Sequence, residues 1–363
     1  MNPRTILITG AETAAGAHIL RMLKRQVERI YVLAEVDAEV DSHENNARVC
    51  DASTAPETQP LVLRGSLSQP RLGLDERAFE AVSAEVDTIF NCAEGTVFDR
   101  DLAKARARNV EPVRCLIEML EKARDARLVH LSTTWVCGTK RGLFTEFDLA
   151  CQQGFYNAYE QSKYEAEYLL RKSSVSERVI IVRRSLTVDM SLFVHEAGVK
   201  TFESLLASLQ TMPRIAVLGD SRARIDVIPV EYLAAATVAL AGTSSAMGRT
   251  VHVVAGWNKS WTLGDLVERI RGRVSNSRVY YWPGPFGAAV RLIAGLSFGR
   301  LLILPRFPAA LPYLRQRCVF DDYLATHLLE PVGLKCPAPE TFWNDSISAP
   351  SKQESAVAAS FSP

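Results

Sequence analysis

Tyr159 and Lys163 carry the strongest chemical signal in this sequence. They lie four residues apart in the segment NAYEQSKYEAEYLL, so on a helix they share one face. A lysine ammonium beside a phenol stabilises the phenolate and lowers the pKa of the tyrosine, which makes it a usable proton donor or acceptor near neutral pH. The ammonium can also bind ribose hydroxyls. Because such pairs are common on solvated helices, their surroundings decide between a catalytic and a surface role.

Three consecutive hydroxyls precede this pair in the chain. Ser132, Thr133 and Thr134 end the strand-like segment RLVHLSTTW, about 25 residues before Tyr159. One of them can hydrogen-bond a substrate carbonyl beside the tyrosine, whereas the alternative is that they cap the following turn. The combination of hydroxyls, phenol and ammonium favours a catalytic site.

The segment TGAETAAG forms a strand-to-helix turn near the start of the chain. Backbone N–H groups and a helix N-terminus in such a turn can hold a pyrophosphate. Gly10 permits the tight turn and Gly16 allows the helix to pack closely on the sheet, with Ala14 in the same turn. Thr13, however, stands where bare backbone usually approaches phosphate. The alternative is a purely structural turn.

Further candidate cofactor residues follow the next strands. Glu35 ends the second strand, where its carboxylate can accept hydrogen bonds from ribose hydroxyls and would repel a 2′-phosphate. It therefore favours NAD over NADP, although an exposed loop carboxylate is an equal alternative. Ser66 and Leu67 follow the third strand, and Cys92 and Ala93 the fourth, where small residues let a flat ring approach the backbone.

Short β-branched runs alternate with stretches of helical periodicity along the first half of the chain. The predicted strands are TILITG, RIYVLAE, LVLRGS, DTIFNCA, RLVHLST and RVIIVRRS. The predicted helices include Gly16–Glu28, Asp75–Val82, Ala103–Arg124 and Ala158–Lys172. This alternation predicts an α/β fold with a doubly wound, Rossmann-like parallel sheet, whose ligands lie beyond the carboxyl ends of the strands.

The second half of the chain follows a looser pattern. We predict a dinucleotide-binding core over residues 1–185 and a smaller C-terminal substrate-binding region over 186–345, interleaved with the last core strands at about 225–255. Residues 346–363 are small and polar without apolar periodicity, which predicts a disordered tail.

Charge and composition exclude several classes of protein. Lys plus Arg number 42 and Asp plus Glu 41, so no global field favours nucleic acid as a partner. The seven cysteines are scattered without CxxC spacing, which indicates no metal site and fits a reducing compartment.

The sequence indicates neither a membrane-spanning protein nor a secreted one. The N-terminus lacks the pattern of a signal peptide, and the apolar run Phe286–Leu304 is interrupted by Arg291 and Arg300, so we predict a cytoplasmic protein without a transmembrane segment. Whether 286–304 contacts a membrane or a lipid-like substrate stays open, as does the oligomeric state, for which a homodimer is one alternative.

At these motifs the sequence resembles the extended short-chain dehydrogenase/reductases, closest to the branch of thioester-reductase domains and fatty acyl reductases. The resemblance covers roughly residues 5 to 240 and rests on TGAETAAG, NCAEG, ARNV, HLSTTW, YEQSK, VIIVRRS and ARIDVIPVEYLA. It implies that Tyr159 is the acid, Lys163 its electrostatic partner and ribose ligand, and Thr133 the carbonyl-polarising hydroxyl. Ser132 and Thr134 are fallback candidates for that hydroxyl. Asn109 matches an asparagine that holds the active-site helix or a relay water, with a simple helix bend as the equal alternative.

Four residues depart from that family's pattern around the expected cofactor. Thr13 replaces the middle glycine, Glu35 stands near an arginine position for NADP, Ser66 replaces an aspartate that contacts adenine, and Arg184 replaces a proline. These departures mean an altered cofactor preference, weaker binding, or a role other than catalysis.

Three functions follow from these observations. The first is an NAD- or NADP-dependent oxidoreductase that reduces a carbonyl or acyl thioester, on a small-molecule or carrier-bound acyl substrate. The apolar segments PGPFGAAVRLIAGLSFGRLLIL and PRFPAALPYL would suit an apolar acyl chain, or they cover the end of the sheet. The second is a sugar-nucleotide epimerase, dehydratase or hydroxysteroid-type dehydrogenase, and the third a non-catalytic binding protein that kept the dinucleotide fold.

Overall fold

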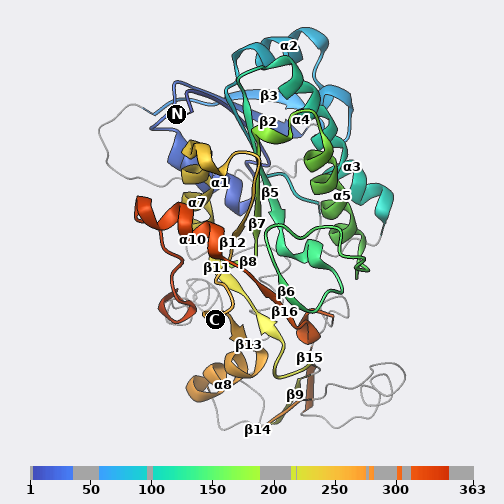
Figure 1. Cartoon of the computed structure of the whole chain (residues 1–363), viewed down its shortest axis with the longest axis vertical. Coiled ribbons are helices and arrows are strands. Elements are labelled where there is room, and N and C mark those ends of the chain that lie inside the picture. Colours follow the sequence, from blue (N-terminus) through green and yellow to red (C-terminus); the bar gives the residue numbers. More distant parts are fainter. Residues whose placement is uncertain are drawn as a thin grey trace, which may run out of the picture.

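A seven-stranded parallel sheet forms the centre of the computed structural model (Figure 1). The structure describes residues 3–35, 57–95, 101–188, 214–217, 219–274, 278–281, 301–304 and 312–342. The strand order is β12-β7-β5-β4-β1-β2-β3. These strands are β1 (Thr5–Thr9), β2 (Arg29–Glu35), β3 (Leu61–Gly65), β4 (Thr88–Asn91), β5 (Arg127–Thr133), β7 (Val179–Arg184) and β12 (Thr250–Val253).

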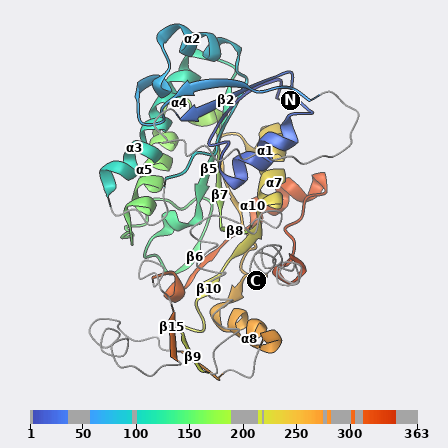
Figure 2. The same ribbon diagram turned by 180° about the vertical axis from the view of Figure 1, so that it is seen from behind.

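Helices cover both faces of this sheet, and each face has its own apolar core. One face packs against α1 (Ala14–Leu23), α7 (Val230–Gly242) and α10 (Tyr323–Leu329). The other packs against α2 (Glu76–Glu85), α4 (Glu111–Lys122) and α5 (Ala158–Lys172), and α3 (Leu102–Asn109) lies beside α5. Figure 2 shows the two helical layers from behind. The predicted doubly wound fold is therefore confirmed.

The single helix predicted over Ala103–Arg124 is in fact two helices. α3 ends at Asn109 and α4 begins at Glu111, with Val110 between them. Pro112 stands at the start of α4, where its missing N–H is harmless, but it could not continue the hydrogen-bond ladder of α3. The apolar periodicity ran through the break and concealed it.

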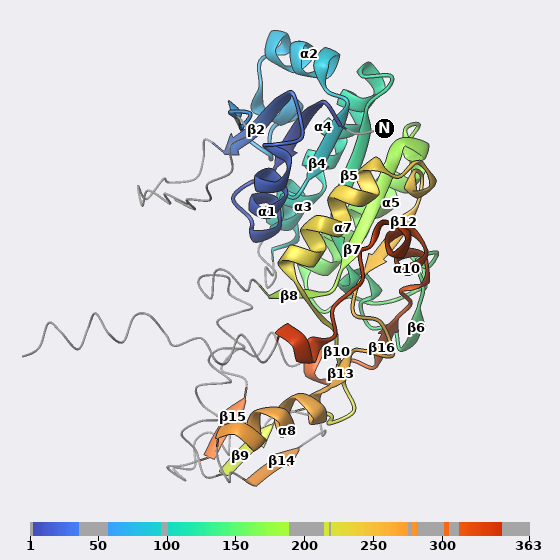
Figure 3. The same ribbon diagram turned by 90° about the vertical axis from the view of Figure 1, so that its left-hand side faces the viewer.

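The strands outside the main sheet are short and lie beyond the carboxyl ends of β5 and β7 (Figure 1). Three pairs of short strands form there: β8 (Leu186–Val188) with β11 (Val227–Pro229), β10 (Arg224–Ile225) with β13 (Trp261–Thr262), and β6 (Gly142–Phe144) with β16 (Cys318–Phe320). A small sheet, β14-β9-β15, comprises Arg278–Tyr281, Arg214–Val217 and Leu301–Leu304. Figure 3 shows this sheet and α8 (Leu263–Val274) at the lower end, remote from α2.

Short 3-10 helices complete the described elements. They are η1 (Pro70–Gly73), η2 (Thr134–Cys137), η3 (Ser176–Arg178), η4 (Ser244–Ala246), η6 (Tyr313–Arg315) and η7 (Glu330–Val332).

The predicted domain limits stay a prediction. In the described residues, the chain returns to the main sheet as β12 after the short strands β8 to β11. The predicted tail, 346–363, lies outside the described residues, as does most of 286–304, of which Leu301–Leu304 forms a strand. Among the helices that the structure describes, none has the length and apolar character needed to span a bilayer.

Candidate active site

Tyr159 and Lys163 are both buried on the face of α5 that packs against the sheet. The Lys163 ammonium donates a 2.7 Å hydrogen bond to the carbonyl oxygen of Leu131 in β5. The Tyr159 ring meets Trp135 edge-on, with centroids 6.4 Å apart. The helix thus carries the phenol and the ammonium to the carboxyl end of β5.

The charge of Lys163 is set by its burial and by nearby ions. Burial lowers the pKa of the ammonium below its ordinary value, and Arg184 adds to this effect, while Glu94 and Glu167 oppose it. A cation held in this way interacts strongly with any anion that develops near it, because little water screens the charge.

The three hydroxyls that end β5 have separate surroundings. Thr133 Oγ1 accepts a 3.2 Å hydrogen bond from the Trp135 N–H and so caps η2. Thr134 Oγ1 is buried, and no hydrogen-bond partner for it occurs among the described residues. Ser132 Oγ donates to Glu167 at 2.5 Å. Ser132 Oγ is therefore held by the carboxylate on α5, and the roles of Ser132, Thr133 and Thr134 as candidate hydroxyls stay predictions.

Asn109 joins α3 to the active-site helix. Its side-chain amide donates to Ser162 Oγ at 2.8 Å, and its oxygen accepts from the Gly95 N–H at 3.0 Å. Ser162 in turn donates to the carbonyl oxygen of Tyr159. Asn109 thus ties the loop after β4 to the turn of α5 that contains the tyrosine.

A capping arrangement fixes the first turn of α5. Asn157 caps the helix by accepting from the Glu160 N–H at 2.9 Å, and its amide donates to the Tyr313 hydroxyl at 2.8 Å. That hydroxyl donates to Glu160 Oε1 at 2.5 Å. Burial raises the pKa of Glu160 to about 7, although the bond from Tyr313 opposes it. The Tyr313 ring also lies 4.5 Å from Trp135, so a residue far along the chain supports the site.

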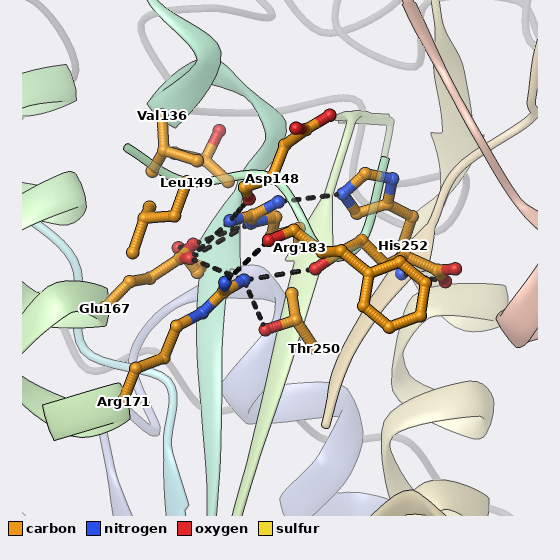
Figure 4. Close-up of polar contacts among 12 residues, drawn as sticks. Val136, Asp148, Leu149, Glu167, Arg171, Arg183, Thr250 and His252 are labelled. Atoms are coloured by element: carbon orange, nitrogen blue, oxygen red, sulfur yellow. Dashed lines mark hydrogen bonds and ion pairs between the residues drawn. The ribbon is translucent and has the colours of Figure 1, made fainter. Parts of the chain in front are cut away.

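A buried ion pair lies one helical turn beyond Lys163 (Figure 4). Arg183 in β7 donates from Nε and Nη2 to Glu167, with the shortest bond 2.8 Å, and both side chains are fully buried. Arg183 also contacts His252 Nε2 at 3.1 Å. The sequence prediction missed these residues, although Glu167 continues the four-residue spacing of Tyr159 and Lys163 on α5.

The glycine turn keeps the two glycines that its geometry requires. Gly10 has φ +71°, and a Cβ added there would lie 2.3 Å from the Ala93 nitrogen. A Cβ on Gly16 would lie 2.0 Å from the Gly10 oxygen. Only glycine fits either position, as expected of a turn that brings α1 close to the strand tips.

Thr13 changes the chemistry of that turn. Its hydroxyl accepts from the Gly16 N–H at 3.0 Å and donates to the Gly10 oxygen at 2.8 Å, so it caps α1. One helix-terminal N–H is therefore satisfied by this chain itself. Ala14 begins the helix behind it.

Glu35 bridges the tips of β2 and β3. Its carboxylate accepts from the Leu67 N–H at 3.0 Å and from Ser66 Oγ at 3.4 Å. Glu12 lies in the glycine turn, close enough to Glu35 to sense its charge. Partial burial raises the pKa of Glu12, and the charge of Glu35 raises it further. Two carboxylates thus lie near each other, one in the glycine turn and one at the tip of β2.

The tip of β4 carries a polar relay and two small buried residues. Thr9 donates to Asn91 at 2.7 Å, and Asn91 contacts His130 Nδ1 at 2.9 Å. Burial, helped by Lys163, lowers the pKa of His130 well below its ordinary value. Cys92 and Ala93 follow and are buried, and burial raises the pKa of the Cys92 thiol.

The structure brings the predicted catalytic and cofactor residues to one edge of the sheet. The residues fit a dinucleotide at the glycine turn and at the ribose position, where the required glycines and an acceptor carboxylate are present. No group of three or more His, Cys, Asp or Glu side chains suited to a metal ion occurs within the described ranges. This edge is that of a dinucleotide-binding α/β protein.

Comparison with known proteins agrees with this class. A family model described as Male sterility protein matches residues 8–237. A hybrid PKS-NRPS synthetase of Penicillium citrinum is 28% identical over 175 residues, which are 46% of this chain and 4% of that protein. Fatty acyl-CoA reductase 1 of Homo sapiens is 25% identical over 221 residues, which are 50% of this chain and 43% of that protein. The chain therefore spans less than half the length of these relatives.

Solved structures share the fold across nearly the whole chain. The terminal R domain from the myxalamid PKS-NRPS pathway has a TM-score of 0.76 at 23% identity, covering 96% of this chain and 90% of that one. UDP-glucuronic acid 4-epimerase from Bacillus cereus, in complex with NAD, has a TM-score of 0.58 at 16% identity, covering 90% of each chain. The chain belongs to the Male sterility protein family, and the predicted membership of the extended short-chain dehydrogenase/reductases is confirmed.

Proposed function

We propose that this chain is an NAD(P)-dependent reductase that transfers a hydride to the carbonyl carbon of an acyl thioester or related carbonyl. The observation that carries the proposal is the burial of Tyr159 and Lys163 on one face of α5, against the tip of β5 that bears Thr133. The curated relatives that include an acyl-CoA reductase support the substrate class.

In this proposal Tyr159 gives its proton to the carbonyl oxygen while Thr133 holds that oxygen by a hydrogen bond. Lys163 stabilises the phenolate that remains, because its ammonium is buried and fixed on the Leu131 oxygen. Asn109 keeps the turn of α5 in place through Ser162. A reduced nicotinamide, when bound, supplies the hydride.

With a thioester, this first step gives a hemithioacetal. Its carbon–sulfur bond then breaks, the hydroxyl proton is transferred to the leaving sulfur, and the products are an aldehyde and a thiol. The similarity to a hybrid PKS-NRPS synthetase supports a carrier-bound acyl chain as the substrate.

The residues proposed to hold the dinucleotide lie at or just after the tips of β1 to β4, except for Lys163 on α5. They are Gly10, Thr13, Ala14, Gly16, Glu35, Ser66, Leu67, Cys92, Ala93 and Lys163. We propose NAD rather than NADP, because the carboxylates of Glu35 and Glu12 lie close to each other and a 2′-phosphate would be repelled by both.

A non-catalytic dinucleotide-fold protein is the second candidate. The observation that favours it is the Thr13 hydroxyl, which already satisfies the Gly16 N–H in the turn where a pyrophosphate would bind. Both candidates share the fold, so cofactor binding and turnover must separate them.

The test is a fluorescence titration with NADH and NADPH, followed by product analysis with an acyl-carrier thioester and with a nucleotide sugar. The proposal expects NADH to bind and the thioester to give an aldehyde with one oxidised dinucleotide per turnover. Binding of neither dinucleotide at millimolar concentration would contradict the enzyme, and conversion of the nucleotide sugar alone would indicate an epimerase or dehydratase.

A further inference from the structure

An ion pair joins the tips of the two strands that flank β5. Arg184 ends β7 and Glu94 follows β4, and the guanidinium donates to the carboxylate from Nη2 at 2.5 Å and from Nε at 3.2 Å. β7 and β4 are the two neighbours of β5, and Arg184 is the register partner of Thr133. Because strands in a sheet are about 4.8 Å apart, the pair must cross the tip of β5 at the level of Thr133.

The Glu94–Arg184 ion pair is largely buried and is held in place by a further hydrogen bond. Each of its two side chains is 14% exposed, and Arg184 also donates to Thr187 Oγ1 at 3.2 Å. Although burial raises the pKa of Glu94, the charges of Arg184 and Lys163 lower it below the ordinary value, so the carboxylate is ionised at neutral pH. Glu94 and Arg184 also act in opposite directions on Lys163, so the bridge lies in the immediate surroundings of the catalytic ammonium.

The order of the strands defines the path of a dinucleotide across this edge. From the centre of this parallel sheet, β1, β2 and β3 follow one another toward one edge and β4, β5, β7 and β12 toward the other, so the strand order reverses between β1 and β4. Ligands of such sheets lie across the strand tips at the reversal. With the adenosine half over the glycine turn and Glu35, the nicotinamide half must pass β4 to reach Thr133 and Lys163. The Glu94–Arg184 pair spans that path.

We infer that the Glu94–Arg184 ion pair determines the affinity of this chain for the nicotinamide half of its dinucleotide: it closes the path over β5 and must open when the ring binds. The inference rests on the proposed function. If the open arrangement is populated to roughly one tenth, the affinity for the whole dinucleotide falls about tenfold. The affinity for the adenosine half stays the same.

The experiment compares two ligands that differ by the nicotinamide alone. Dissociation constants for NADH and ADP-ribose are measured by fluorescence and by calorimetry for the native chain and for the double variant E94A/R184A. Removing both partners avoids an uncompensated buried charge. We expect the double variant to bind NADH about tenfold more tightly, and ADP-ribose as the native chain does.

A matched control uses an ion pair that touches no strand tip. Arg106 and Glu165 join α3 to α5 through two 2.7 Å hydrogen bonds, so R106A/E165A should change neither constant.

Two outcomes would overturn the inference in distinguishable ways. If E94A/R184A binds NADH no more tightly than the native chain while both bind ADP-ribose, the ion pair does not control the nicotinamide half and the proposed function stands. If no variant binds NADH, NADPH or ADP-ribose at millimolar concentration, the dinucleotide site itself is refuted, and the inference falls with the proposed function.

Discussion

The buried Arg183–Glu167 pair gives a stability prediction that can be worked from its contacts. Arg183 Nε donates to Glu167 Oε1 at 3.1 Å and to Oε2 at 3.0 Å, while Nη2 donates to Oε2 at 2.8 Å and to the carbonyl oxygen of Asp148 at 2.7 Å. Neither side chain is exposed. Replacing Arg183 by Met leaves the Glu167 carboxylate buried, with Ser132 and the more distant Arg171 as its partners. Breaking one partner of such a pair costs about 3–5 kcal/mol in free energy of unfolding.

A double-mutant cycle separates the ion pair from the packing around it. E167M should cost about as much as R183M, because it leaves a buried guanidinium with fewer acceptors. The double variant R183M/E167M should cost no more than either single variant, since no uncompensated charge then remains. Unfolding in guanidinium chloride, followed by tryptophan fluorescence, gives these free energies if the dependence on denaturant is unchanged.

The control for this cycle is the more exposed Arg106–Glu165 pair on the same helix, whose arginine is 48% exposed. R106A should cost far less than either core variant, because an exposed ion pair contributes little to stability. If R183M and E167M cost no more than R106A, or if their costs simply add in the double variant, the view that mutual neutralisation holds these charges in the core is refuted.

Three further predictions concern the site itself. Y159F should lower turnover by on the order of 10²–10⁴ while the dinucleotide constant stays within about twofold; a fully active variant would remove Tyr159 as the acid. T13G should tighten dinucleotide binding by freeing the Gly16 N–H, at a cost of only a few tenths of a kcal/mol in stability; unchanged binding would mean that the turn tolerates the threonine. Because burial raises the pKa of Glu160 and of Glu146 to about 7, the folded chain binds more protons than the unfolded one between about pH 4.5 and 7, and stability should fall as pH rises through that window. E160Q should remove about 1.4 kcal/mol per pH unit of that slope; an identical slope in E160Q would contradict the assignment.

The sequence predicted the elements whose signal is local. The β-branched runs became the strands of the main sheet, and the four-residue spacing of Tyr159 and Lys163 placed both on one buried face of α5. Glu167 lies on the same spacing and could have been recognised as a third member of that face. The break at Pro112 was hidden, because the apolar periodicity of α4 continues into the end of α3.

The interactions that the sequence could not predict join residues far apart in the chain. Glu94 meets Arg184, Glu167 meets Arg183, and Asn157 meets Tyr313, with separations of 90, 16 and 156 residues. A local pattern shows that an arginine is present, but its partner is set by the order of the strands. The sequence therefore indicated that Arg184 was unusual at its position, and only the fold supplied the carboxylate that it binds.

The adjacent arginines at the end of β7 explain how the tip of β5 is held. Successive residues of a strand point to opposite faces, so Arg183 turns toward α5 and Arg184 toward the other side. Their register partners in β5 are Ser132 and Thr133. Ser132 binds the same carboxylate as Arg183, and the bridge from Arg184 to Glu94 passes the tip at Thr133. The Arg183–Glu167 pair thus fixes β5 from the side of α5, while the Arg184–Glu94 pair controls the open edge of the sheet. Loss of Arg183 should therefore disturb the position of Thr133, and loss of Arg184 should change the accessibility of Thr133.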